Sequence, residues 1–347
     1  MKKLFTFFLL LLYAPFAFAC STFLLAKNGQ YVFGRNYDWV SGNGMVVVNA
    51  RGVQKTSLVM EGEKAATWTA KCGSITFNQY GKDFPHGGIN EKGLVVELMW
   101  LDGTAYPARD NRAAMNELQW IQYQLDNFAT VDEVIASNKT IRISDKDAVP
   151  LHYLVADASG KAATIEFIAG QMVVHKGTDL RFPVLTNTPY AEALQQVTTK
   201  GNASFDNNSV NRFATACRMV QGFQQTPSAA KPVDYAFTIL DKIAQGSFTK
   251  WRIVYDITAR EIHFSTGGQR KTIALKSFDF SCSGPTLFLN INSNNKGDVT
   301  AAFTPLTSAI NKQVLQQSAE ESRSSVTISE KNLTEAAAYY QKTKCMD

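Results

Sequence analysis

AFACSTFLLAKNGQYVFGRNYDW (residues 17–39) joins two kinds of sequence at Cys20. Before Cys20 the chain has two lysines, then an almost wholly apolar run, and finally the letters AFA. Small residues three places and one place before the cut are what signal peptidase needs, and the apolar run is too short for a membrane-spanning helix. The sequence therefore predicts that residues 1–19 are a signal peptide and that the mature chain begins with a cysteine.

The residues after the cut predict a β-hairpin. Two strand-like runs flank Asn-Gly at residues 28–29, the strongest short hairpin signal. With that turn, Thr22 pairs with Arg35 and Cys20 with Tyr37, and all four side chains share one face. Arg35 is diagonal to Cys20 at a Cα separation of about 7–8 Å, which its long side chain can close. The hairpin thus predicts a cation beside the thiol.

A cysteine at the mature N-terminus carries a nucleophile and a base in one residue. Its α-amine has a pKa of about 7.7–8.0 and can take the thiol proton, so no histidine is required. A thiol with a pKa of about 8.5, lower beside a cation, is a good nucleophile. Asp38 lies one residue beyond Tyr37, so in a regular strand its side chain points to the opposite face from Cys20. It reaches the amine of Cys20 only if the chain bends near residues 36–37.

The composition limits the kinds of partner that the mature chain is expected to bind. Without the two signal lysines it has 33 basic and 30 acidic residues, a net charge of +3, which favours neither nucleic acid nor an acidic membrane surface. No second segment is apolar enough to span a membrane, and the four histidines have no metal-ligand spacing, which leaves a structural role for them. The four remaining cysteines allow three disulfide pairings or buried free thiols; they are Cys72, Cys217, Cys282 and Cys345.

The order of elements predicts an α+β fold of two antiparallel sheets between helical layers, in a single domain, residues 20–347. Strand patterns and helix patterns come in blocks, without regular βαβ alternation. Strands are expected over 20–101, 151–177 and 249–275, and helices over 114–137, 208–224, 232–245 and parts of the tail from 308.

Several motifs resemble the choloylglycine hydrolase family of N-terminal nucleophile hydrolases, which contains bile salt hydrolases and penicillin V acylases. Cys20 with STF and FGRNYDW resembles the family's N-terminus. GGINEKGL (87–94), VLTNTPY (184–190), NSVNRF (208–213) and TKWRIVYD (249–256) follow in the family's order. The resemblance implies a four-layer αββα sandwich and hydrolysis of linear amide C–N bonds without a cofactor.

The resemblance also implies roles for individual residues. Cys20 attacks the amide carbonyl with its own amine as base, Arg35 sits beside the thiol, and Asp38 orients the amine. Asn187 and the backbone N–H of Trp100 stabilise the oxyanion, and Arg212 completes the polar network. From the sequence alone, Asn187 also fits a turn residue before Pro189, and Arg212 a solvated helix charge.

Two departures from the family pattern bear on the substrate and the assembly. Many members have Asn or Tyr at the place of Trp100, where a backbone donor survives the change. The stretch SFDNNSVNRF lacks the Pro-Gly-Asp of many relatives, which leaves the implied homotetramer open. The C-terminal tail matches least and is assigned no catalytic residue.

Trp39 and Trp100 are expected to flank the acyl pocket. Flat indole walls favour a phenyl ring, by about 0.5–1.5 kcal/mol for stacking, and narrow the slot for a steroid. The small-molecule substrate is therefore expected to be an amide of the penicillin V type or an acyl-homoserine lactone, cleaved by a periplasmic or secreted enzyme. Conjugated bile salts are the alternative. A third possibility is a lipid-anchored binding module with Cys20 as the anchor. Lipoprotein signals usually have a small residue two places before the cysteine, and the bulky Phe18 at that place argues against this interpretation.

Overall fold

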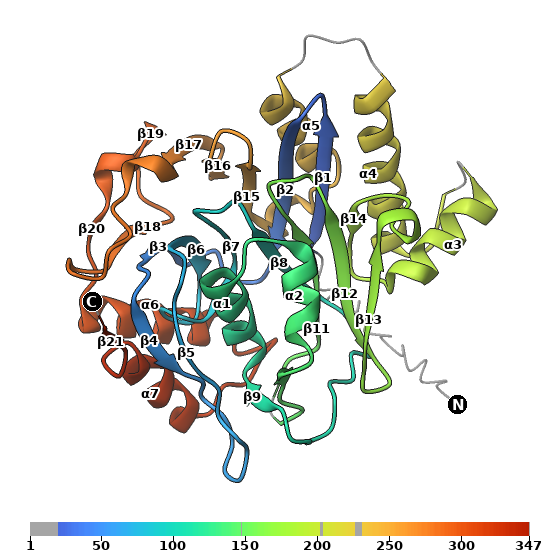
Figure 1. The fold of residues 1–347 in the computed structure, drawn as a ribbon. Coiled ribbons are helices and arrows are strands. Elements are labelled where there is room, and N and C mark those ends of the chain that lie inside the picture. Colours follow the sequence, from blue (N-terminus) through green and yellow to red (C-terminus); the bar gives the residue numbers. More distant parts are fainter. Residues whose placement is uncertain (1–19, 147, 202–203, 226–230, 347) are drawn as a thin grey trace, which may run out of the picture.

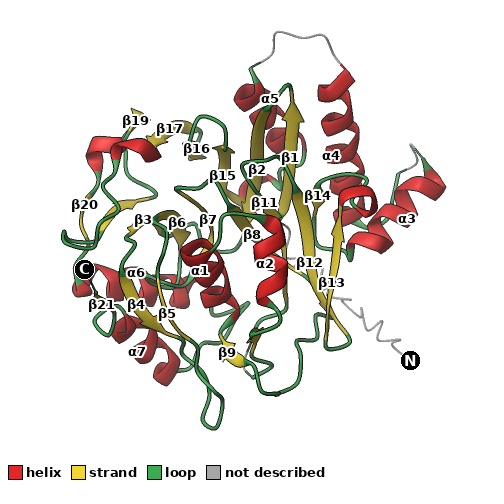
Figure 2. Ribbon diagram, viewed as in Figure 1, coloured by secondary structure: helices red, strands yellow, loops and turns green. Residues whose placement is uncertain are grey.

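The computed structural model describes residues 20–146, 148–201, 204–225 and 231–346. The predicted signal peptide lies outside the described residues. Two β-sheets are stacked face to face, and helices cover both outer faces (Figure 1). Figure 2 separates these helical layers from the strands by colour. The predicted α+β sandwich with αββα layering is confirmed.

One sheet has seven strands and carries the N-terminal hairpin at its centre. In spatial order they are β14 (Val184–Leu185), β1 (Ser21–Lys27), β2 (Gln30–Asp38), β15 (Thr249–Asp256), β16 (Glu261–Thr266), β17 (Gln269–Ala274) and β19 (Gly297–Asp298). Neighbours are antiparallel except for the short parallel pair of β17 and β19. Helices α3 (Tyr190–Lys200), α4 (Asn208–Gln225) and α5 (Pro232–Lys242) cover its outer face (Figure 1).

The second sheet has nine antiparallel strands. In spatial order they are β13 (Gln171–Lys176), β12 (Ala162–Ile168), β11 (Leu151–Ala156), β8 (Val95–Trp100), β7 (Pro85–Asn90), β6 (Ser74–Asn78), β3 (Met45–Asn49), β18 (Leu287–Asn290) and β20 (Thr304–Pro305). Its outer face packs against α1 (Glu117–Asn127), α2 (Val131–Ser137), α6 (Ser308–Glu321) and α7 (Glu330–Tyr339).

Two small sheets complete the chain. They are β9 (Ala113–Met115) with β10 (Ile141–Ile143), and β4 (Val53–Thr56) between β5 (Thr67–Thr69) and β21 (Lys344–Cys345). The strand at β9 corrects the prediction that a helix begins at residue 114, because α1 begins only after the N-cap Asn116. A capping box between Thr130 and Glu133 is present at the start of α2.

The core between the sheets is aromatic. Phe77 from the nine-stranded sheet lies edge-on to Tyr255 and Phe264 of the other sheet, at centroid distances of 6.2 and 5.6 Å. All three side chains are fully buried. Burying large apolar side chains between the two inner faces is what holds such a sandwich together.

The N-terminal hairpin has the predicted register. Thr22 lies opposite Arg35, and the turn residues Asn28 and Gly29 have φ values of 51° and 74°. Positive φ at both positions is what a type I′ turn requires, and its twist matches that of the strands. The predicted alternation of faces is therefore set by local sequence.

The irregularity near Asp38 lies in the partner strand. β15 pairs with β2 regularly up to Trp251 opposite Tyr37, and then Thr249 rather than Lys250 lies opposite Asp38. The extra residue in β15 is a β-bulge, which twists the pair locally. A bend near residues 36–37 was expected from the sequence; the structure shows a pairing irregularity beside Tyr37 and Asp38, with the extra residue in the partner strand β15.

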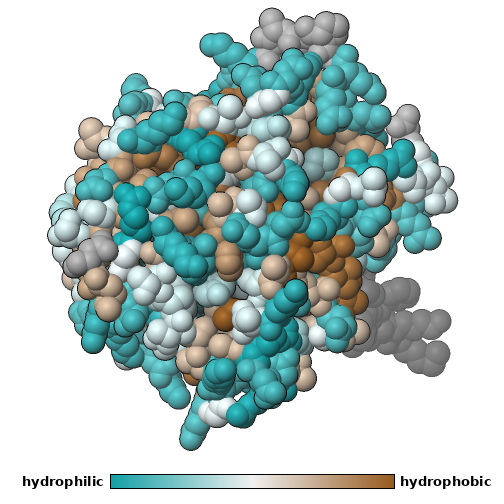
Figure 3. Space-filling model, viewed as in Figure 1, coloured by the Kyte–Doolittle hydropathy of each residue, from teal (hydrophilic) through white to brown (hydrophobic). Residues whose placement is uncertain are grey.

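The four cysteines other than Cys20 divide into one disulfide and two buried thiols. Cys282 and Cys345 form a disulfide across 63 residues, and Cys72 and Cys217 are free. On the face shown in Figure 3, an apolar area lies over β12 and β13 within a mostly polar surface. Among the helices that the structure describes, none is long and apolar enough to cross a membrane.

Candidate active site

Cys20 lies directly before β1 with its thiol buried between the two sheets. Only 4% of the residue is exposed. Arg35 Nη2 is 4.0 Å from Sγ, and Sγ is 3.9 Å from the backbone oxygen of Asp38. Burial raises the pKa of the thiol, and the positive charge of Arg35 opposes that rise. The predicted cation beside the thiol is in place.

Arg35 is fixed by backbone oxygens and an aromatic ring. Its Nη1 donates to the oxygen of His86 at 3.2 Å and pairs with the carboxylate of Glu97. Its Nη2 donates to the oxygen of Leu98 at 3.2 Å, and the guanidinium lies 4.9 Å from the ring centroid of Tyr37. Because these contacts surround the guanidinium, it keeps one position relative to Cys20.

Glu97 is a site-supporting residue that the sequence analysis missed. Its carboxylate is fully buried, accepts from Tyr255 Oη and pairs with Arg35. Burial raises the pKa of Glu97 to about 7, and Arg35 opposes this rise. A Cβ on Gly87 would overlap this carboxylate. The glycine in the motif GGINEKGL therefore makes room for the carboxylate behind Arg35.

Asp38 has one satisfied and one unsatisfied carboxylate oxygen. Oδ1 accepts a hydrogen bond from the Thr249 hydroxyl, which the bulge in β15 places there. Oδ2 is buried and has no hydrogen-bond partner among the residues that the structure describes. Burial raises the pKa of Asp38 to about 6, while Thr249, Arg212 and Arg35 oppose the rise. Such an oxygen is a natural acceptor for one further donor.

Arg212 joins the nucleophile residue to Asn187. Its Nη1 donates at 2.6 Å both to the oxygen of Cys20 and to Ser21 Oγ, and its Nη2 donates to Asn187 Oδ1 at 2.9 Å. Asn187 Nδ2 in turn donates to the oxygen of Trp100 at 2.7 Å. Arg212 is only 5% exposed, so it is not a solvated helix charge.

The backbone N–H of Trp100 points to the side of β8 that faces away from β11, where Arg35 binds the oxygen of Leu98. Leu101 N–H donates to the oxygen of Pro150 across to β11. Successive backbone groups of a strand point in opposite directions, so Trp100 N–H points away from β11. The oxygen of Leu98, two residues earlier, points the same way and accepts from Arg35.

A buried histidine supports the loop that carries Asn187. His152 Nε2 lies 2.6 Å from the oxygen of Thr186, and its Nδ1 lies 3.1 Å from the carboxylate of Glu166. Glu166 also accepts from the N–H of Tyr190, directly after the loop, at 3.0 Å. His152 thus has the structural role that the sequence analysis gave it.

A cavity of about 480 Å³ opens beside Cys20. Trp39 and Trp100 both line it, as predicted, with ring centroids 6.2 Å apart and planes inclined by 32°. Apolar side chains also line the cavity; they include Leu58, Val59, Phe84, Leu118, Val149, Leu151, Val326, Ile328 and Ala336. In the described part of the chain, no group of three His, Cys, Asp or Glu residues is arranged to hold a metal ion.

A sequence model of the linear amide C–N hydrolases, choloylglycine hydrolase family, matches residues 20–229. The chain belongs to the choloylglycine hydrolase family. A penicillin V acylase of Pectobacterium atrosepticum is 28% identical over 277 residues, which are 64% of this chain and 71% of that protein.

Solved structures of family members share the fold. The penicillin V acylase of Agrobacterium tumefaciens superposes with a TM-score of 0.71 at 25% identity, covering 83% of this chain and 98% of that chain. The conjugated bile acid hydrolase of Clostridium perfringens gives a TM-score of 0.67 at 17% identity, covering 80% and 98%. This protein is therefore a linear amide hydrolase of the choloylglycine hydrolase fold.

Proposed function

We propose that the protein is an exported penicillin V acylase-like hydrolase in which Cys20 becomes the nucleophile when residues 1–19 are removed. The observation that carries the proposal is the convergence on Cys20 of Arg35, Asp38 and the chain of contacts from Arg212 to Asn187. Its relatives of 28% and 25% identity are penicillin V acylases.

The first step of the proposed reaction is attack of Cys20 Sγ on the amide carbonyl. The free α-amine, with a pKa of about 7.7–8.0, takes the thiol proton. The unsatisfied Oδ2 of Asp38 is the acceptor that holds and orients this amine. The charge of Arg35 stabilises the thiolate as it forms.

The carbonyl oxygen becomes an oxyanion between two donors. Asn187 Nδ2 has a second N–H beside the one bonded to Trp100, and Trp100 N–H is the other donor. The tetrahedral intermediate collapses, the C–N bond breaks, and the α-ammonium returns its proton to the leaving amine. Water, deprotonated by the α-amine, then hydrolyses the thioester and regenerates the thiol.

Export is supported by the redox chemistry of the chain. Disulfides persist in oxidising compartments such as the periplasm and are rare in the cytosol. The Cys282–Cys345 disulfide is consistent with a periplasmic or secreted enzyme. We therefore propose that the reaction occurs outside the cytoplasm.

The test is amine release by the purified mature protein, after intact mass has shown that it begins at an unmodified Cys20. Penicillin V, glycocholate, taurocholate and a long-chain acyl-homoserine lactone are compared side by side. We expect preference for penicillin V or the lactone. Cys20→Ala should abolish hydrolysis, and Cys20→Ser should leave at most a trace. Efficient bile salt cleavage would contradict the substrate proposal, and an acylated Cys20 would contradict the mechanism.

A further inference from the structure

One wall of the cavity comes from a part of the chain that the family match does not reach. The match ends at residue 229, whereas Val326, Ile328 and Ala336 line the same cavity as Cys20. We call residues 326–336, which include the first turns of α7, the C-terminal wall. The cavity is therefore built by two regions that are far apart in the sequence.

Just before its N-terminal end, the C-terminal wall is attached to Trp39, the residue after Asp38. Trp39 Nε1 donates to Ser322 Oγ at 3.1 Å, and Tyr80 Oη donates to the same oxygen at 2.9 Å. Ser322 is the C-cap of α6 and is fully buried. These contacts fix both the indole of Trp39 and the chain that enters the wall.

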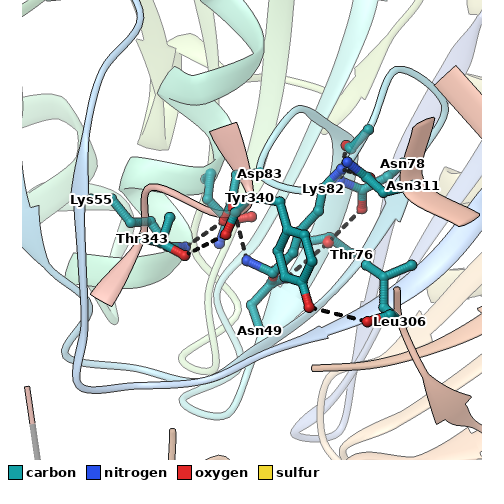
Figure 4. A network of polar contacts seen from close by, with 12 residues as sticks. Asn49, Lys55, Thr76, Asn78, Lys82, Asp83, Leu306, Asn311, Tyr340 and Thr343 are labelled. Carbon is teal, nitrogen blue, oxygen red and sulfur yellow. Dashed lines mark hydrogen bonds and ion pairs between the residues drawn. The ribbon is translucent and has the colours of Figure 1, made fainter. Parts of the chain in front are cut away.

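Just after its C-terminal end, the chain of the C-terminal wall is held by a buried polar network and by the disulfide. Figure 4 shows the network, in which Lys82 N–H donates to Asn311 Oδ1 at 2.8 Å and Tyr340 Oη donates to the oxygen of Leu306 at 3.0 Å. The ammonium of Lys82 also lies 5.6 Å from the ring centroid of Tyr340. Beyond Tyr340, β21 pairs with β4, and its Cys345 forms the disulfide with Cys282.

We propose that the C-terminal wall determines substrate specificity by receiving the far end of a linear apolar acyl chain and limiting its length. The inference rests on the proposed function, because it assigns the acyl group of the amide to this cavity. Val326 packs against the hydrophobic cluster that contains Cys20, whereas Ala336 packs against the other cluster, with Phe84 and Leu118. Between them the wall lines the cavity with Thr327, Ile328, Ser329, Asn332 and Glu335, and Ala336 is its smallest side chain there. A larger side chain at position 336 shortens the space available to the acyl chain.

The chemistry of the cavity favours a flexible apolar chain over a short polar acyl group. Each methylene that leaves water on binding increases affinity about fourfold. A wall fixed at both ends keeps its shape, so this gain stops abruptly once the acyl chain reaches it. We therefore expect kcat/KM to rise with the length of the acyl chain and then to reach a limit set by the side chain at position 336.

The experiment uses p-nitroanilides of butanoic and decanoic acid, whose hydrolysis releases a coloured amine. Ala336→Phe is compared with Thr334→Phe, a matched control on the exposed side of the same helix. In the wild type, we expect kcat/KM for the decanoyl substrate to exceed that for the butanoyl substrate by at least roughly 100-fold. Ala336→Phe should lower the decanoyl value about 10-fold or more and leave the butanoyl value within about twofold.

Equal effects of Ala336→Phe on both substrates, or no effect on either, would overturn the inference. If Ala336→Phe does not fold, Ala336→Leu takes its place. Decanoate binding to Cys20→Ala, measured by calorimetry, tests the wall even if the wild type cleaves no amide. Weaker decanoate binding with Ala336→Phe than with Thr334→Phe supports the wall, and equal binding refutes it. A failure of hydrolysis alone counts only against the proposed function.

Discussion

Replacing Glu117 by Gln should change how the stability of the protein depends on pH. Glu117 is the first residue of α1, lines the cavity and is only 4% exposed. Asn116 Nδ2 donates to its carboxylate at 2.8 Å, but no cation partners it among the contacts of the described chain. Burial raises the pKa of Glu117 from 4.5 to about 7. The folded protein therefore holds this proton over a pH range in which the unfolded chain has lost it.

The sign and size of the effect follow from that difference. Between pH 4.5 and 7 the unfolded state binds fewer protons than the folded state, so the free energy of unfolding falls as pH rises. A pKa difference of about 2.5 units corresponds to a loss of about 3 kcal/mol, complete above pH 7. Glu117→Gln, which cannot ionise, should escape this loss. At pH 8.5 the variant should be more stable than the wild type by up to about 3 kcal/mol, and at pH 5 by less than about 1 kcal/mol.

The measurement is urea unfolding of the wild type and the variant at both pH values. Glu133→Gln provides a control of opposite sign. Hydrogen bonds from Ala129 N–H and Thr130 lower the pKa of Glu133, so its carboxylate stabilises the fold at high pH and loses that effect as pH falls. Identical pH dependence in the wild type and Glu117→Gln would show that the buried carboxyl is not held protonated.

Three further predictions concern the site and its support. Asn187→Ala removes the proposed oxyanion donor and should lower kcat for penicillin V by about 10²–10³-fold with little change in KM; a loss below tenfold would assign the oxyanion to other groups. Glu97→Gln leaves the Arg35 charge without its buried partner and should cost about 3–5 kcal/mol in urea unfolding at pH 8, whereas a cost near zero would mean that Tyr255 and backbone oxygens suffice. Cys345→Ser opens a 63-residue loop and should cost about 4 kcal/mol of stability, and reduced wild-type protein should match the variant.

The local parts of the site could be predicted from the sequence. The hairpin register depends on the turn at Asn28 and Gly29, so the approach of Arg35 to Cys20 follows from neighbouring residues alone. The position of Asp38 could not be derived in the same way. It depends on a bulge in β15, more than 200 residues later, whose Thr249 holds the carboxylate.

Long-range contacts account for what sequence reasoning left open. Arg212 fits an exposed helix position by its spacing, but packing of α4 on β1 buries it against Cys20. Glu97 looks like an ordinary strand residue until Arg35 from the other sheet lies beside it. Helix α3 went unpredicted, and no spacing indicated that Cys282 pairs with Cys345. The C-terminal tail, to which no catalytic role was assigned, lines the cavity.

The division of the cavity between two regions of the chain separates the C-terminal wall from the groups around Cys20. In the described chain, the hydrogen-bond partners of Cys20, Arg35, Asp38 and Arg212 lie at or before Thr249, and Glu97 behind Arg35 is held by Tyr255, whereas the C-terminal wall begins at 326. Mutations in the wall can therefore accumulate without touching the reacting groups. Changes confined to this short C-terminal stretch can therefore reshape the cavity while the hydrogen bonds around Cys20 stay intact.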